Sequence, residues 1–269
     1  MAISPESLMP DFALAVEDLS EQAARLDGKP ELVQVAAQLC ESYRALAICI
    51  LAADGDVDRF FHFLLHAPLA RRRYLATVGC LTSTPAAEKK ASDIGPLLDA
   101  VAGRQWELAK DIARLTLGHW VENAEYEEDY CHGEYWRRLC MDPGKDESAL
   151  LDRWDNALEG GEDPRLDVAC ALNANDRSAF VAALRALLLH NETKAEELSS
   201  PLGGSALSED PTFEPNRWIS IEGLAWLAAA ERAGMVLDEE FEGCPRIART
   251  DRYAPFMPFA YPNSGLAGV

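Results

Sequence analysis

The residue types that could do chemistry are most concentrated in one short segment, residues 125–136, which reads EYEEDYCHGEYW. On a helix, Asp129 and His132 would lie one turn apart among several other carboxylates. A carboxylate and a histidine at this spacing can ligate a metal, but helical di-iron sites need matching Glu-x-x-His motifs on two helices. The chain has no second motif of this kind beyond Asp129-x-x-His132 and its neighbours. We therefore predict no metal ligand, no cofactor and no catalytic residue.

Two further histidines, His62 and His66, stand four residues apart, which is the spacing of a two-histidine ligand pair on a helix. Residues 60–65 (FFHFLL) are otherwise apolar, and no glutamate follows the first histidine. We interpret both as structural histidines of a core helix. The chain also lacks the GxSxG, HExxH, Walker and GxGxxG motifs, so we predict that it is not an enzyme.

Acidic charge gathers around the first segment. Residues 122–163 hold fourteen acidic and four basic side chains, and their net charge of −10 is half of the net charge of the whole chain, −20. Aromatic side chains anchor protein interfaces, and carboxylates steer basic partners toward them. We interpret this region as a contact face for a basic protein; the alternative is a solvated acidic helix whose aromatic side chains point inward. The predicted partner-binding residues are Glu125, Tyr126, Glu128, Asp129, Glu134 and Trp136, with the acidic loop residues Glu209, Asp210 and Glu214 as second choice.

The composition of the whole chain supports a basic protein partner. Its 269 residues include 45 acidic and 25 basic side chains, and such a field repels nucleic acid and anionic lipid, although solubility alone can also explain it. The N-terminal residues show no signal peptide, and no run approaches the roughly 18 apolar residues of a membrane span. The seven scattered cysteines are typical of a reducing compartment. We expect a cytoplasmic protein that binds neither nucleic acid nor membrane; self-association stays open.

Apolar residues recur at helical spacing along almost the whole chain, without the alternation of strands. Pro68 is expected to kink or end a central helix, and residues 199–216 are expected to form a loop. The sequence predicts a single all-α domain, 1–269, with a helical body at 11–241 and an extended, proline- and aromatic-rich tail at 242–269 packed on it. Helices are expected at 11–26, 30–53, around 60–65, 94–102, 105–118, 125–140, 146–158, 165–173, 176–198 and 217–233.

A weak internal repeat refines the predicted fold. Residues 99–115 can be laid over residues 170–187 with Gly103 opposite Asn175, and a third copy begins near Gly55. In each copy an apolar helix stops at a residue that tolerates positive φ, and a second apolar helix follows. Stacked antiparallel helix pairs are typical of solenoids, but the spacings between copies are unequal. We expect an irregular, solenoid-like stack of antiparallel helical hairpins.

The helix predicted at 217–233 carries two tryptophans. Asn216 is a suitable N-cap for it. Trp218, Glu222 and Trp226 are spaced i, i+4 and i+8, so they would share one face. A tryptophan stripe of this kind is more often core than binding site, and we interpret it as core.

Several of these segments together resemble one known family. The stretches NRWISIEGLAWL at 216–227, CPRIAR at 244–249 and YEEDY at 126–130 look like the immunity-49 family of bacterial polymorphic-toxin systems, and HNETKAEEL at 190–198 is similar too. The resemblance covers mainly residues 95–250. It implies an all-helical protein that binds a cognate toxin in the cytoplasm and neutralises it by stoichiometric protein–protein binding, with no catalytic residues. The acidic charge favours a toxin with a basic face, such as a nuclease.

Two other functions stay open at this point. The chain could be a helical-repeat scaffold or regulatory protein that binds a basic host protein, or a metalloprotein or enzyme that uses the Asp129/His132 carboxylate cluster. An immunity gene should directly follow a large secreted toxin gene, which separates the first alternative from an immunity protein. Metal analysis of untagged protein tests the second.

Overall fold

A computed structural model describes residues 3–29, 31–79, 86–199 and 212–249 of the chain. These residues form eleven α-helices and two short 3₁₀ helices and contain no strand, which confirms the predicted all-α class. The elements are α1 (Pro5–Leu26), α2 (Leu32–Asp54), α3 (Val57–Gly79), η1 (Ala86–Lys89), α4 (Gly95–Ala102), α5 (Trp106–Leu115), α6 (Glu127–Met141), α7 (Ser148–Ala157), α8 (Pro164–Asn173), α9 (Arg177–Ser199), α10 (Phe213–Trp218), α11 (Ile221–Arg232) and η3 (Arg246–Arg249).

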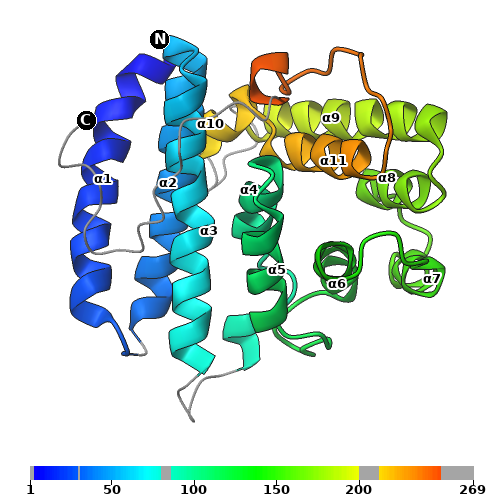
Figure 1. Ribbon diagram of the computed structural model, residues 1–269, viewed down its shortest axis with the longest axis horizontal. Coiled ribbons are helices and arrows are strands. Elements are labelled where there is room, and N and C mark those ends of the chain that lie inside the picture. The colour runs from blue at the N-terminus through cyan, green and yellow to red at the C-terminus, as the bar shows by residue number, and fades with distance from the viewer. Residues whose placement is uncertain (1–2, 30, 80–85, 200–211, 250–269) are drawn as a thin grey trace.

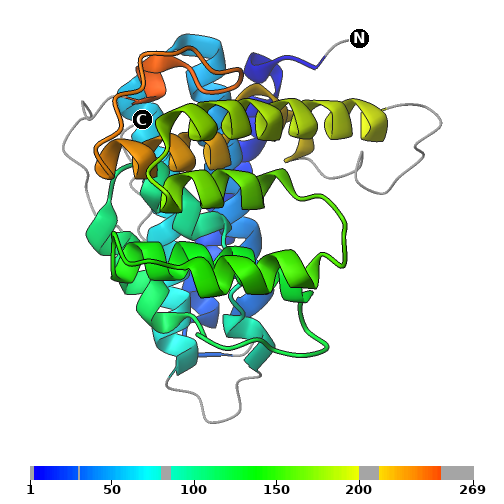
Figure 2. The same cartoon turned by 90° about the vertical axis from the view of Figure 1, so that its right-hand side faces the viewer.

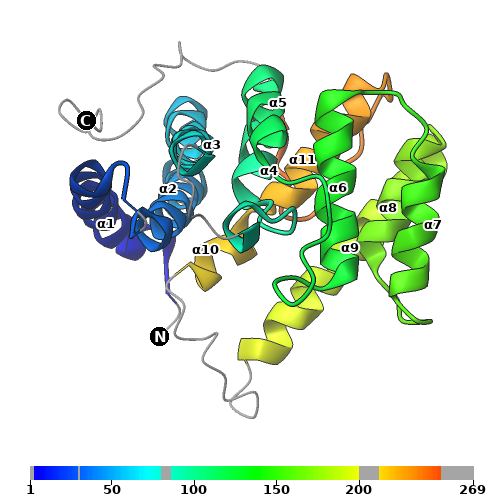
Figure 3. The same cartoon turned by 90° about the horizontal axis from the view of Figure 1, so that it is seen from below.

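The helices run in different directions in the two halves of the molecule (Figure 1). α1, α2 and α3 lie side by side, with α4 and α5 next to them, whereas α6 and α7 are seen nearly end-on. Seen from below, α6–α9 lie on the side opposite α1–α3 (Figure 3). Most large contacts join helices that follow each other in the sequence, but α11 packs mainly on α4, far earlier in the chain. In a solenoid each repeat contacts only its neighbours, so the solenoid-like order of the predicted stack is not confirmed.

α2 packs between α1 and α3 and is largely buried. By length and composition alone it could cross a membrane: its most apolar window has a mean hydropathy of 1.4, and 72% of that window is buried inside the protein. This corrects the expectation that no run approaches the length of a membrane span. A helix covered on several sides must be apolar nearly all round, so a core position is enough to explain this composition.

α3 continues through Pro68 to Gly79, so the helix does not end at this proline, and of the two predicted effects only a kink stays a prediction. A proline inside a helix removes one backbone hydrogen bond. Leu64, Leu65 and Leu69, around the proline, are almost completely buried. Burial of these side chains offsets the lost hydrogen bond, because tertiary packing supplies most of the stability of a helix in a protein.

The two histidines of α3 make structural contacts. His66 is 4% exposed, its Nδ1 lies 2.6 Å from the carbonyl oxygen of His62, and its ring stacks on Tyr43. Burial, which is the largest cause, together with the nearby His62 ring lowers the pKa of His66 to about 4, although its hydrogen bond to the His62 carbonyl acts in the opposite direction. These contacts agree with the interpretation of His66 as a neutral core histidine.

The three helix pairs of the predicted repeat turn through one left-handed residue each. These residues are Gly55 (φ 66°) between α2 and α3, Arg104 (φ 55°) between α4 and α5, and Asn175 (φ 51°) between α8 and α9. The left-handed residue that corresponds to Asn175 is thus Arg104 and not Gly103, so the predicted overlay is one residue out of register. Gly103 provides space instead, because a Cβ there would stand 2.6 Å from a methyl carbon of Leu65.

The segment predicted as one helix after Asn216 is interrupted. α10 ends at Trp218, and Ile219 is extended. Ser220 is the N-cap of α11, and its Oγ accepts a hydrogen bond from the Gly223 N–H at 3.0 Å. Asn216 lies inside α10, so it is not the N-cap, and the predicted loop at 199–216 ends in a helix.

The interruption also separates Trp218 from Glu222 and Trp226, so these three side chains do not share one helix face. Trp226 is fully buried, and its ring centroid lies 4.2 Å from that of Trp136, which agrees with its interpretation as core. Of the predicted tail, residues 246–249 form a 3₁₀ helix that packs on α11. Residues 250–269 lie outside the described residues.

Long-range ion pairs and one continuous core hold distant helices together. Arg44 of α2 donates two hydrogen bonds, of 2.7 and 2.8 Å, to the fully buried Asp99 of α4. Arg104 donates to Glu231 of α11 and to the carbonyl oxygen of Arg249. The buried hydrophobic side chains, from α1 to α11, form a single cluster, which is consistent with the predicted single domain.

Candidate partner-binding face

Glu125, the first of the predicted contact residues, is used inside the protein. Its carboxylate accepts hydrogen bonds from the backbone N–H groups of Ser92 at 2.9 Å and Val121 at 3.1 Å. Its carbonyl oxygen accepts one from Trp120 Nε1. These bonds hold the chain that enters α6, so Glu125 has a structural role whatever else it contacts.

Tyr126 and Glu128, at the beginning of α6, remain accessible for contact with a partner. Tyr126 is the N-cap residue and is 74% exposed, the largest exposed fraction among the exposed large hydrophobic side chains described. Glu128 lies in the first turn and forms no ion pair with any described residue. Carboxylates in the first turn are favoured by the helix dipole, which explains locally why acids begin this helix.

Glu134 and Trp136 are buried, which corrects the expectation that they lie on a contact surface. Trp136 is 0% exposed and donates its indole N–H to His132 Nε2 at 3.1 Å. The Glu134 carboxylate, 1% exposed, is hydrogen-bonded by both Arg137 and Arg138. Aromatic and acidic residue types suit an interface, but here they lie on the inner face of α6 and hold it against its neighbours.

Asp129 and His132, the pair of the metalloprotein hypothesis, belong to a charged network between α6, α8 and α11. Arg165 of α8 lies 3.4 Å from both Asp129 Oδ1 and His132 Nδ1. His132 Nε2 in turn lies 3.3 Å from Glu222 Oε1 of α11. Burial by itself would raise the pKa of Glu222, but His132 and Arg165 outweigh it and the pKa is lowered. The network therefore stabilises charged Glu222 and ties three helices together.

The geometry of this network argues against a metal site. Arg165 also pairs with both oxygens of Asp163, at 2.9 and 2.8 Å, and so brings a fixed positive charge next to Asp129 and His132. A guanidinium repels a metal cation. Within residues 3–29, 31–79, 86–199 and 212–249, no three or more His, Cys, Asp or Glu side chains converge as metal ligands.

The second-choice acids add little to a face. Glu214 lies in α10 and pairs with Arg217 at 3.4 Å, three residues later. Glu209 and Asp210 lie outside the described residues. Among the predicted contact residues that the structure describes, Tyr126 is exposed and Glu128 is half-buried, and both lie at the beginning of α6.

A row of exposed acids that lack a basic partner among the described residues lies on α7 and continues beyond it. Asp152, Asp155 and Glu159 follow one another at three- and four-residue spacing, are exposed, and form no ion pair with any described residue. Glu162 and Asp167 continue the row toward α8 in the same state. We call these five residues the acidic row. Their charges are not neutralised within the described protein, so they dominate the local field.

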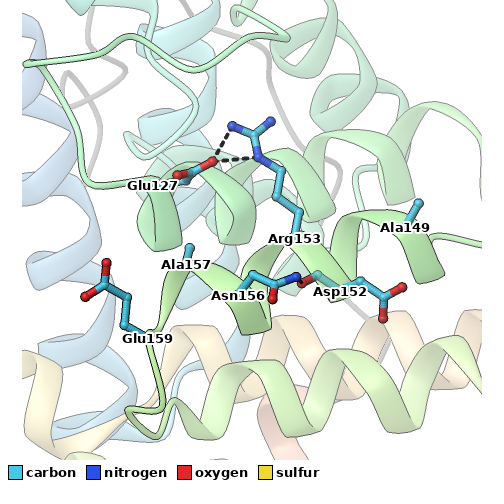
Figure 4. A pocket seen from close by; sticks show the side chains of 7 residues that line it. All are labelled: Glu127, Ala149, Asp152, Arg153, Asn156, Ala157 and Glu159. Atoms are coloured by element: carbon cyan, nitrogen blue, oxygen red, sulfur yellow. Dashed lines mark hydrogen bonds and ion pairs between the residues drawn. The ribbon is translucent and has the colours of Figure 1, made fainter.

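Between the acidic row and α6 lies an open hollow of about 440 Å³ (Figure 4). Glu127 reaches from α6 to Arg153 of α7, with Oε1 lying 2.6 and 2.8 Å from two guanidinium nitrogens. Asp152 and Glu159 stand on either side of this ion pair. Arg153 also lies over the Tyr130 ring, 4.9 Å from its centroid. Because Glu127 neutralises Arg153, the hollow keeps the negative charge of the other two acids.

The acidic row is not among the predicted contact residues, because that prediction rests on aromatic content. Residues 122–163 hold the acidic excess, but the first-choice contact residues lie in and just before α6, where the tyrosines and Trp136 are. The 152–155–159 spacing was a usable signal, since positions three and four apart share a helix face. Leu151 and Trp154, which directly precede Asp152 and Asp155 in α7, are buried, which leaves these two acids on the outer face.

Comparisons of the chain with family models, with curated proteins and with solved structures find no match. The resemblance to the immunity-49 family therefore stays a prediction.

Proposed function

We propose that this protein is an immunity protein that binds a cognate bacterial toxin in the cytoplasm and neutralises it by stoichiometric protein–protein contact, without catalysis. One observation carries the proposal: the acidic row is exposed and has no basic partner among the described residues, and Glu127, which pairs with Arg153 of α7, directly follows the exposed Tyr126 in the chain. The resemblance described above supplies the class of partner, and the charge supplies its chemistry, a basic face such as that of a nuclease.

The distribution of ion pairs supports a binding role for this face. Glu134 and Glu147 are buried with arginine partners, and Asp163 is paired with Arg165. Carboxylates left clustered without partners repel one another, and a basic partner relieves that repulsion while it accelerates association. An exposed aromatic next to such charges is the type of residue that anchors interfaces.

A scaffold or regulatory protein that binds a basic host protein would use the same face. The identity of the partner distinguishes the two functions. The first experiment is therefore co-purification of the chain with the C-terminal domain encoded immediately upstream of its gene. An immunity protein should form a stable complex with that domain and abolish its toxicity. If the domain is not toxic and does not bind, the scaffold or regulatory function becomes the favoured one.

Charge reversal then tests the face. Asp152→Lys, Asp155→Lys and Glu159→Lys together should weaken toxin binding at least tenfold in a titration by calorimetry. The matched control reverses three exposed acids of α1, at the other end of the molecule (Figure 1): Asp11→Lys, Glu17→Lys and Asp18→Lys. Both triple variants change the net charge equally, so equal affinities of the two variants would show that the acidic row is not the contact face.

A further inference from the structure

A groove of about 580 Å³ runs between α8 and α9. These two helices and α7 lie on the same side of the molecule (Figure 2). Most of the side chains that line the groove are small and apolar, so a partner can approach the backbone of α8 and α9 closely. Six alanines make most of the lining, together with Cys170 and the two rim acids Asp167 and Asp176: Ala171, Ala174, Ala179, Ala182, Ala183 and Ala186.

The α9 wall is an apolar helix face without a partner helix in the described protein. Ala179, Ala182 and Ala186 are exposed, and Leu189, one turn further, is 63% exposed. The opposite face of α9 carries the buried Leu184. A globular protein usually turns only one apolar stripe of a surface helix toward its core, so α9 has a second stripe available for an external contact.

The charges around the groove are of one sign. Asp167 and Asp176 line it, although Asp176 also accepts a hydrogen bond from the Ala179 N–H. Burial, first, and then Asp167, Asp155 and Asp152 raise the pKa of the Cys170 thiol, so carboxylates of the acidic row act directly on the groove.

The arginines of α9 do not neutralise this rim. Arg177 bonds to the carbonyl oxygen of Val236 and pairs with Glu239. Arg185 lies over the Phe241 ring, 5.7 Å from its centroid. Both are engaged with the segment that follows α11, which leaves the groove apolar at its centre and negative along its edge.

This charge pattern selects the occupant. A second copy of the chain would bring the same acids and a net charge of −20 against the rim, and like charges across an interface are costly. Lysine and arginine at the edges of a helix would instead face the rim acids. Alanine walls allow close approach, since helix axes pack about 8–10 Å apart depending on the side chains between them.

We propose that the α8–α9 groove binds an amphipathic helix of the partner that has small apolar residues along one face and lysine or arginine along both edges of that face. This inference rests on the proposed function, because the toxin is the protein that supplies the helix. α8 has ten residues, which corresponds to about 15 Å, so the groove takes about three turns of the partner helix. Such a helix-in-groove contact places its anchors at i, i+3, i+4 and i+7.

Cys170 provides a built-in readout, because it is the exposed thiol among the cysteines that the structure describes. The probe is an 18-residue amidated peptide with alanine and leucine at i, i+3, i+4 and i+7 and lysine at the flanking positions. A peptide of the same composition with the stripe scrambled is its control. The background variant Cys80→Ser removes the thiol outside the described residues. The rate of Cys170 modification by a disulfide reagent is measured against peptide concentration, and the affinity by fluorescence anisotropy.

We expect the striped peptide to slow Cys170 modification at least fivefold, with an affinity that falls as salt rises. Ala182→Arg, which fills the groove and repels lysine, should weaken binding at least tenfold. Ala52→Arg, the same change at an exposed alanine of α2, should leave it unaltered. No protection, equal protection by the scrambled peptide, or equal binding by both variants would overturn the proposal.

Protection that grows with protein concentration in the absence of peptide would identify a second copy as the occupant and would equally overturn the proposal. None of these results depends on the toxin. A protein that neutralises the toxin but leaves Cys170 unprotected by the peptide would refute this inference alone.

Discussion

Replacing Glu134 with glutamine should destabilise the protein rather than weaken its binding to a partner. The side chain is 1% exposed. Oε1 accepts hydrogen bonds from Arg137 Nη2 at 2.8 Å and Arg138 Nε at 2.6 Å, and Oε2 accepts one from Arg137 Nε at 2.5 Å. Glutamine keeps the shape but removes the charge, and its amide group would present hydrogen-bond donors to arginine donors.

The magnitude follows from this geometry. Removal of one partner from a buried ion pair costs about 3–5 kcal/mol. Arg138 is 36% exposed and retains Glu147 at 2.8 Å, so part of its charge stays paired and solvated, and we take the lower limit, about 3 kcal/mol. In a large domain each kcal/mol shifts Tm by about 2–4 °C, so Tm should fall by about 6–12 °C.

Thermal and urea unfolding followed by circular dichroism measure this effect. The control is Glu128→Gln, the same change in the same helix at a position without an ion pair among the described residues. Loss of one first-turn charge should cost less than about 1 kcal/mol. If Glu134→Gln unfolds like the wild type while its affinity for the partner drops, Glu134 is a contact residue and the reasoning from burial is refuted.

Two further predictions concern the core. Acidification from pH 6.5 to pH 4 should lower the free energy of unfolding by about 3 kcal/mol through His66. The pKa of His66 is about 4 in the folded protein and 6.5 in the unfolded chain, so the unfolded chain binds the proton first as the pH falls. If the His66→Phe variant has the same stability–pH profile as the wild type, this prediction is wrong. Gly133→Ala should destabilise the protein by about 1–3 kcal/mol, because the new Cβ would stand 2.0 Å from the Ala91 carbonyl oxygen. An unshifted urea midpoint would show that α6 and the backbone at Ala91 can move apart at little cost in free energy.

Local chemistry explains why most helices could be predicted. Apolar spacing indicated the elements, and residues tolerant of positive φ indicated the turns at Gly55 and Asn175. The register error at Gly103 arose because glycine is the usual left-handed residue, whereas the fold places Arg104 there. The Arg104 guanidinium donates hydrogen bonds to Glu231 and to the Arg249 carbonyl oxygen. These long-range contacts offset the free-energy cost of the left-handed backbone conformation at a non-glycine residue, and they cannot be inferred from the local sequence.

The α10–α11 break was missed for a similar reason. Residues 216–222, which include the break at Ile219, contain no proline or glycine that would mark an interruption. The Ser220 N–H bonds to the Gly243 carbonyl oxygen at 2.8 Å, and this partner lies beyond the C-terminal end of α11. A helix that would continue on local propensity is thus interrupted by a contact that only the fold supplies.

The helical class, the acidity and the region in which acidic charge gathers can be predicted from the sequence alone, because composition and periodicity are properties of short stretches of chain. Which acids are neutralised depends on the tertiary structure. Glu134 and Glu127 lie near arginines and are paired, whereas Asp152, Asp155 and Glu159 face outward and are not. Coulomb energy depends on distance and on burial, and both are set by how α6, α7 and α8 pack rather than by the order of residues along them.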